Sequence, residues 1–254
     1  MDYHDRPEVS ASMLKSMATG WRTFEAEYIT KTAPRKETAA MMLGTAIHCA
    51  LLEPERYEHE YVICPAECSD RRTKAYKEWA ADADNACKVP LSSSDGEIIQ
   101  RVLDNCQANQ AVRAVLELPG KVEHEVYWTD QETDISCRAK VDKLCDQIII
   151  DIKTTDDARK NPFAKTIASW RYDIQASHYL DGTGLTAFIF LAVEKTSPFR
   201  CRLYEISSHD SANAQEARLT LLQQYRNRKL TNDWSEDEEF QVTPLFLPRF
   251  LLSF

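Results

Sequence analysis

The chain has 254 residues, 43% of them hydrophobic and 28% charged, with a formal net charge of −9. No apolar run approaches the length of a membrane span, and only six glycines and no low-complexity tract are present, which argues against linkers or a division into two domains. The acidic balance differs from the basic footprint of most nucleic-acid-binding proteins, and the length is sufficient for one domain over residues 1–254 with a sizeable core.

The first part of the chain, residues 1–118, is predicted to be mainly helical. Ser10 or Ser12 is a suitable N-cap for a first helix, and Pro54 and Pro119-Gly120 provide stop signals further along. Apolar periodicity predicts the other helices over residues 38–52, 72–86 and 95–118.

Strands dominate the next part of the chain, residues 119–207. They are predicted over 122–128, 135–142, 147–153, 186–193 and 201–206, with a helix over 163–180. The remaining part, residues 208–254, is expected to hold a long helix over 212–228 and an apolar tail. This order predicts an α/β core with a central mixed sheet.

An acid and a lysine stand two residues apart at the end of the predicted strand 147–153. Residues i and i+2 of a strand share a face, so Asp151 and Lys153 should project together. Asp142 ends the preceding strand, and the short link between the two strands indicates a hairpin that would bring Asp142 close to Asp151. Paired carboxylates favour hard cations such as Mg²⁺. Taken alone, an Asp-x-Lys pair occurs by chance in many proteins and is more often a surface ion pair worth little.

Three other patterns accompany this pair. A helical segment contains Gly44-Thr45-Ala46-Ile47-His48, a β-rich run contains Glu125, and a later helix carries Gln175 and Tyr179 at i, i+4. Taken in chain order, these elements resemble the RecB-like branch of the PD-(D/E)xK nuclease superfamily, in particular the exonuclease VIII type. The likeness extends from Ser10 to the tail near Phe250, and it implies an αβββαβ core with a helical N-terminal elaboration.

The resemblance assigns a role to each of these residues. It implies metal ligation by His48, Asp142, Asp151 and the backbone carbonyl of Ile152, with Lys153 orienting or deprotonating the attacking water. Glu125 would be a ligand to a second metal or through water, although Glu123 lies on the same predicted strand face and remains an alternative. Supporting or DNA-contacting roles fall to Gln175, Tyr179, Ser10, Ser12 and Lys15. Ordinary helix packing and capping would also explain those five residues, and a core histidine would explain His48.

The implied activity is that of a Mg²⁺-dependent exodeoxyribonuclease, with Mn²⁺ as a substitute. It would digest linear double-stranded DNA from its ends, 5′ to 3′ and processively, and leave a 3′ single strand for recombination. The expected partners are DNA ends, a homo-oligomeric ring (a tetramer, with a trimer as second choice) and a single-strand annealing protein. Alternatives are an endonuclease or single-strand nuclease of the same superfamily, or an end-binding module without catalysis.

Eight cysteines are present, and none forms a Cys-x-x-Cys pair. Only Cys201 follows the predicted catalytic segment, whereas the iron–sulfur clusters of some relatives need three late cysteines. We therefore expect no iron–sulfur cluster, reduced thiols and a cytoplasmic protein, since the first residues do not form a signal peptide. The apolar tail, residues 246–254, would either form a subunit contact or pack onto its own domain.

Overall fold

A six-stranded mixed sheet forms the centre of the computed structural model, which describes residues 3–33, 38–66, 72–82 and 87–236. The strand order is β1-β5-β6-β7-β8, and β4 pairs with the other edge of β5. The strands are β1 Val9–Ser10, β4 Gly120–Thr129, β5 Ser136–Cys145, β6 Ile148–Thr155, β7 Ala187–Glu194 and β8 Cys201–Tyr204. A second, two-stranded parallel sheet joins β2 Tyr61–Ile63 to β3 Val89–Leu91. The predicted α/β class with a central mixed sheet is confirmed.

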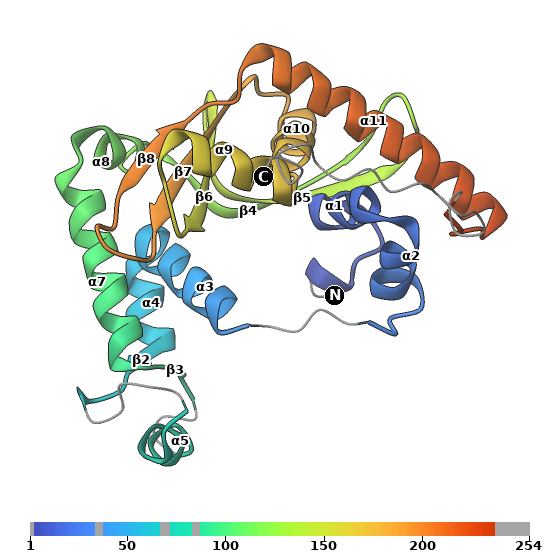
Figure 1. Ribbon diagram of the computed structural model, residues 1–254. Coiled ribbons are helices and arrows are strands. Elements are labelled where there is room, and N and C mark those ends of the chain that lie inside the picture. Colours follow the sequence, from blue (N-terminus) through green and yellow to red (C-terminus); the bar gives the residue numbers. More distant parts are fainter. Residues whose placement is uncertain (1–2, 34–37, 67–71, 83–86, 237–254) are drawn as a thin grey trace, which may run out of the picture.

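Helices cover both faces of the main sheet (Figure 1). The helices of the described residues are η1 Tyr3–Asp5, α1 Ala11–Thr19, α2 Trp21–Phe24, η2 Glu25–Ile29, α3 Ala39–Leu52, α4 Pro54–Glu60, α5 Lys74–Ala80, α7 Ser93–Ala108, α8 Gln110–Leu116, α9 Lys160–Trp170, α10 Tyr172–Thr183 and α11 Ser208–Thr231. Among the described residues, no helix has the length and apolar character needed to cross a membrane.

The N-terminal helices begin at polar caps. Ser10 Oγ accepts a hydrogen bond from the Met13 N–H at 3.3 Å, so Ser10 rather than Ser12 caps α1. Thr38 caps α3 in the same way. Pro54 ends the preceding pattern as predicted but also occupies the first position of α4, where its missing N–H costs no hydrogen bond.

Two helices predicted to be continuous are broken in the structure. The segment 95–118 forms α7 and α8, separated at Asn109, whose side chain accepts hydrogen bonds from the first turn of α8. The segment 163–180 is divided by Arg171, a left-handed residue with φ 50°. The helix predicted over 72–86 is shorter, because α5 ends at Ala80, and residues 83–86 lie outside the described part.

The sheet is buried on both sides. On one side, α3 and α7 pack on residues such as Ile152 and Leu191. On the other side, α1, α9 and α10 pack on residues such as Val141 and Ile149, and α11 lies over α10 (Figure 1). Burial on both faces explains why β6 and β7 are nearly continuous apolar runs rather than alternating ones.

Strands β5 and β6 form a fork. Their ladder contains only the pairs Lys143↔Ile150 and Leu144↔Ile149. Beyond this point β6 continues beside β7, whereas β5 pairs with the two-residue strand β1. The strands therefore separate where Asp142 and Asp151 lie, and this opening leaves room for the candidate site.

The described cysteines differ in one respect from the sequence-based expectation. Six of them are free thiols: Cys49, Cys87, Cys106, Cys137, Cys145 and Cys201. Cys64 is in a disulfide, so the prediction of reduced thiols is wrong at this position.

Candidate active site

Three side chains that can bind a metal meet beside the fork. His48 of α3, Glu123 of β4 and Asp142 of β5 each offer a ligand atom, and these atoms lie within 4.8 Å of one another. His48 Nδ1 is 3.3 Å from Asp142 Oδ2, and both side chains are partly exposed, so solvent can reach them. One imidazole and two carboxylates form a suitable donor set for a divalent cation such as Mg²⁺ or Mn²⁺.

The close approach of α3 to β6 brings His48 to this place. A Cβ atom on Gly44 would lie only 3.2 Å from Thr154 Oγ1, so even alanine there would require the helix or the Thr154 side chain to shift by a few tenths of an ångström. His48 follows Gly44 by about one turn and lies on the same side of α3. The Gly-Thr-x-x-His pattern thus has a physical reason in this structure.

An irregularity between β4 and β5 brings Glu123 towards Asp142. Glu123 has φ 49°, and the ladder passes from Val122↔Lys143 to His124↔Val141 without pairing Glu123 with Asp142. Val141 and Leu144 pack in the same hydrophobic cluster, which strict alternation along β5 would forbid. The left-handed backbone costs free energy, and such strain is common at functional sites.

Glu125 lies outside this cluster. Its Oε2 accepts a hydrogen bond from the Tyr127 hydroxyl at 2.5 Å, and the side chain is exposed. Glu123, in contrast, pairs with Lys140 at 2.7 Å and faces His48 and Asp142. The structure therefore places the alternative residue, Glu123, where the resemblance would put Glu125.

Asp151 and Lys153 form a buried pair on the α10 side of the fork. Lys153 Nζ lies 2.5 Å from Asp151 Oδ2, and Gln175 Nε2 donates to Asp151 Oδ1 at 2.7 Å. The Asp151 side chain has no exposed surface. The backbone N–H of Ile152 donates to Asp142 Oδ2 at 2.7 Å and so connects this pair to the first cluster.

Burial governs the protonation of the site. It raises the pKa of both Asp142 and Asp151 to about 6, against the opposing attraction of Lys153. Burial also lowers the pKa of His48 to about 4, with a further contribution from Lys153, so the imidazole is neutral at pH 7 and keeps a lone pair for a metal. Burial alone would lower the pKa of Lys153, but Asp151 and Asp142 outweigh it and raise the pKa. A divalent cation would compensate carboxylates that are costly to ionise here.

The supporting residues form a second layer. Lys15 Nζ donates to Gln175 Oε1 at 3.1 Å, and Tyr179, which is buried, forms a side-chain hydrogen bond with Gln175. Burial raises the pKa of Tyr179 well above its ordinary value. Ser12 is partly exposed on α1, and Ser10 serves as the helix cap described above.

Sequence reasoning did not identify Tyr172. Its ring centroid lies 4.7 Å from Lys153 Nζ and 5.1 Å from Lys15 Nζ. The available signal was its position three residues before Gln175, which places both residues on one face of a helix.

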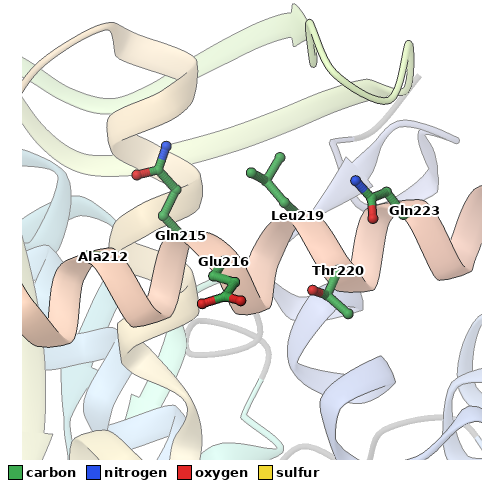
Figure 2. Close-up of a pocket in the computed structure, with 6 residues that line it drawn as sticks. All are labelled: Ala212, Gln215, Glu216, Leu219, Thr220 and Gln223. Carbon is green, nitrogen blue, oxygen red and sulfur yellow. The ribbon is translucent and has the colours of Figure 1, made fainter.

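A shallow hollow of about 410 Å³ lies elsewhere, along α11 (Figure 2). Its lining residues are Ala212, Gln215, Glu216, Leu219, Thr220 and Gln223. All six come from a single helix, and none belongs to the carboxylate cluster. This hollow is therefore separate from the candidate active site.

Comparisons with known proteins identify the family and the fold. Residues 10–240 match the model of a family described as a PDDEXK-like domain of unknown function, DUF3799. The chain belongs to this family. The PD-(D/E)xK-like fold expected from the sequence is thereby confirmed. No curated protein sequence matches the chain.

Among solved structures, a candidate exonuclease from Eubacterium rectale matches with a TM-score of 0.59 and 14% identity, covering 100% of this chain and 98% of that one. An alkaline exonuclease from Laribacter hongkongensis matches with a TM-score of 0.30 and 14% identity, over 74% and 92% of the two chains. A phage-related exonuclease from Haemophilus somnus has a TM-score of 0.33 at 13% identity, over 63% and 89%. The first of these shares the fold, and the other two scores are too low to support an argument.

Proposed function

We propose that this protein is a metal-dependent exodeoxyribonuclease that digests linear double-stranded DNA, 5′ to 3′ and processively, and leaves a 3′ single strand for recombination. The proposal rests on one observation. The cluster of His48, Glu123 and Asp142 lies next to the buried pair of Asp151 and Lys153, and the hydrogen bond from the Ile152 N–H to Asp142 connects the two groups. A cation-binding cluster beside a buried lysine is suited to phosphodiester hydrolysis, because the chain itself needs only to position charges. The exonuclease name of the Eubacterium rectale neighbour, which shares the fold, supports the same class of activity.

In this proposal, His48, Glu123 and Asp142 hold Mg²⁺, with Asp151 and the Ile152 carbonyl as the further ligands that the resemblance implies. When bound, the metal polarises the phosphate and lowers the pKa of water. Lys153 orients the attacking water and neutralises charge that develops on the phosphate oxygens. Asp151 fixes the Lys153 ammonium, and Gln175 fixes the Asp151 carboxylate.

The test uses linear duplex labelled at its 5′ or 3′ end, incubated with the purified chain with and without Mg²⁺. We expect nucleotide release from the 5′ end only when metal is present, and no attack on closed circular DNA. Asp151→Ala and Lys153→Ala should both abolish release, and Asp151→Ala should leave DNA binding nearly intact. Wild-type turnover by either variant would show that the site is assigned incorrectly.

The same assay separates the alternatives. Cleavage of closed circles or of single strands would indicate an endonuclease or a single-strand nuclease. DNA-end binding without metal-dependent nucleotide release would indicate an end-binding module. The presence together of His48, Asp142, Asp151 and Lys153 favours catalysis over simple binding.

We also propose that the active form is a closed homo-oligomeric ring, a tetramer with a trimer as second choice. An acidic chain can concentrate basic side chains around DNA by repeating one patch around a channel. The apolar tail suggested as a contact lies outside the described residues. A monomer in light scattering at micromolar concentration, with short distributive products, would contradict the ring and leave the metal site unaffected.

A further inference from the structure

Five residues beside the fork form a closed circuit of contacts. Lys153 pairs with Asp151, which accepts a hydrogen bond from Gln175, which in turn accepts one from Lys15. The circuit closes through Tyr172, whose ring lies within reach of both ammonium groups, at 4.7 Å for Lys153 and 5.1 Å for Lys15. The two lysines come from different elements, α1 and β6, and the aromatic ring is their shared neighbour.

This arrangement gathers two cations around one aromatic ring in a partly buried environment, with the Lys15 and Lys153 ammonium groups 5.1 and 4.7 Å from its centroid. Such proximity is unfavourable unless other groups compensate for the repulsion between the ammoniums. Asp151 compensates Lys153 directly, and the electron-rich face of the Tyr172 ring attracts both cations. Two ammonium groups around one ring can attract the negative charge of a phosphodiester group.

The backbone fixes the position of the ring. Arg171 adopts a left-handed conformation with φ 50°, so α10 begins at Tyr172 in a direction set by this break. The Arg171 side chain is held by Asp173 at 3.1 Å, and the Tyr172 ring packs near Phe190 of β7, with 6.4 Å between ring centroids. Tyr172 is therefore anchored to the core independently of either lysine.

We propose that Tyr172 is a positioning residue that holds Lys15 and Lys153 together as a two-lysine cradle for one phosphodiester group of the DNA. This inference rests on the proposed nuclease function and deepens it. Lys15 then binds substrate rather than only supporting α1, and Tyr172 acts through the two ammonium groups without touching the DNA. Because the interaction uses the aromatic ring, phenylalanine should replace tyrosine, whereas an aliphatic residue should not.

The experiment compares Tyr172→Phe with Tyr172→Leu, and uses Tyr57→Leu as a matched control. Tyr57 is a partly buried tyrosine of α4 that stacks on Tyr61 and contacts neither lysine. The affinity for a blunt linear duplex is measured in Ca²⁺, and kcat and KM in Mg²⁺. We expect Tyr172→Leu to weaken binding and to lower kcat by about tenfold each, whereas Tyr172→Phe and Tyr57→Leu stay within about twofold of the wild type.

Lys15→Met and the double variant Lys15→Met/Tyr172→Leu complete the test. If Tyr172 acts through Lys15, the effect of Tyr172→Leu on duplex affinity must shrink when Lys15 is already absent. The inference would be overturned if Tyr172→Leu kept wild-type duplex affinity and kcat, or if Tyr172→Phe lost as much of both as Tyr172→Leu. It would also be overturned if the losses of duplex affinity in Lys15→Met and Tyr172→Leu simply added in the double variant. If Tyr172→Leu fails to fold in thermal unfolding, wild-type duplex affinity of Lys15→Met would overturn it. The affinity in Ca²⁺ does not require turnover, so absence of cleavage by the wild type would refute the proposed function alone.

Discussion

Asp142 and Asp151 have pKa values near 6, well above the ordinary value of an aspartate, because burial disfavours their charged forms. The folded protein thus binds these protons more tightly than the unfolded chain. Their contribution to stability is fully present below about pH 4 and is lost as the pH rises through about 6. A metal ion requires the charged carboxylates, so protons and metal compete for this site.

This competition gives a prediction for metal binding. Mg²⁺ should raise the unfolding temperature at pH 7.5 and have little effect at pH 5, since a ligand stabilises only as far as it binds the folded state. Thermal unfolding at a series of Mg²⁺ concentrations at both pH values measures the effect, with Asp142→Asn as the control. Equal stabilisation at pH 5 and pH 7.5 would argue against carboxylate ligation.

The two glutamates of β4 offer a matched pair of variants. Glu123→Gln should weaken metal binding by at least about tenfold and lower turnover, because Glu123 lies with His48 and Asp142. Glu125→Gln should have a much smaller effect, since its carboxylate binds the Tyr127 hydroxyl instead. Titration of Mn²⁺ by calorimetry, together with kcat, decides between them. A larger loss in Glu125→Gln would restore the assignment that the resemblance implies.

The sequence was informative about side-chain direction only where the strands are regular. Alternation correctly predicted that Asp151 and Lys153 share a face. It could not separate Glu123 from Glu125, because the left-handed backbone at Glu123 changes the direction of one side chain and depends on contacts across the sheet. The Tyr172 contacts were also inaccessible, since Lys15 is far away in the sequence and reaches the ring only in the folded chain.

At the scale of elements, His178 of α10 connects two strands. Its Nε2 lies 3.2 Å from the Val9 carbonyl of β1 and 3.1 Å from the Arg138 carbonyl of β5. Both partners are acceptors, so Nε2 must carry the proton, and the buried Nδ1 has no hydrogen-bond partner among the described residues. Burial, followed by repulsion from Arg218, lowers the pKa of His178 to about 3.

Acid should therefore weaken the link between β1, β5 and α10. The contribution of neutral His178 to stability is full above about pH 6.5 and is lost as the pH falls towards 3, at up to about 1.4 kcal/mol per pH unit. We expect His178→Gln to be less stable at pH 7.5 but to lose less stability than the wild type between pH 6.5 and 5. Thermal unfolding across this range is the measurement. Identical pH profiles for the two proteins would contradict this role of His178.

The breaks in helices were less predictable than the helices themselves. Arg171 is neither a proline nor a glycine, so the usual stop signals are missing at that break, whereas Asn109 is a common N-cap residue that the apolar periodicity of the segment obscured. Strand β1 has two residues, which is too short to show any periodicity. Its pairing with β5 nevertheless places α1, and with it Lys15, beside the fork.

At the scale of the whole molecule, the order of elements was sufficient to predict a mixed α/β sheet, because a helix between β6 and β7 implies a parallel crossover. The fork was not predictable from local patterns. It arises because β1 replaces β6 beside β5, which joins segments more than 120 residues apart. The ends of the described chain are joined in a comparable way, through Trp234.

Trp234 closes the described C-terminal segment onto the N-terminal helices. Its ring centroid lies 5.3 Å from that of Phe24 and 6.2 Å from that of Trp21, and only 4% of the residue is exposed. Beside it, Arg228 donates to the Ser235 carbonyl at 2.7 Å. These contacts connect α11 to the N-terminal helical segment that contains α1 and Lys15.

Removal of this contact should affect both stability and the site. We expect Trp234→Ala to lower the free energy of unfolding by about 3–5 kcal/mol, the usual cost of emptying a buried aromatic position. Trp170→Ala is the matched control, because that side chain is 65% exposed and its loss leaves no cavity. Denaturant unfolding gives both values, and duplex affinity shows whether loosening α1 also weakens DNA binding through Lys15. Equal stability of the two variants would mean that the C-terminal segment is not part of the folding core.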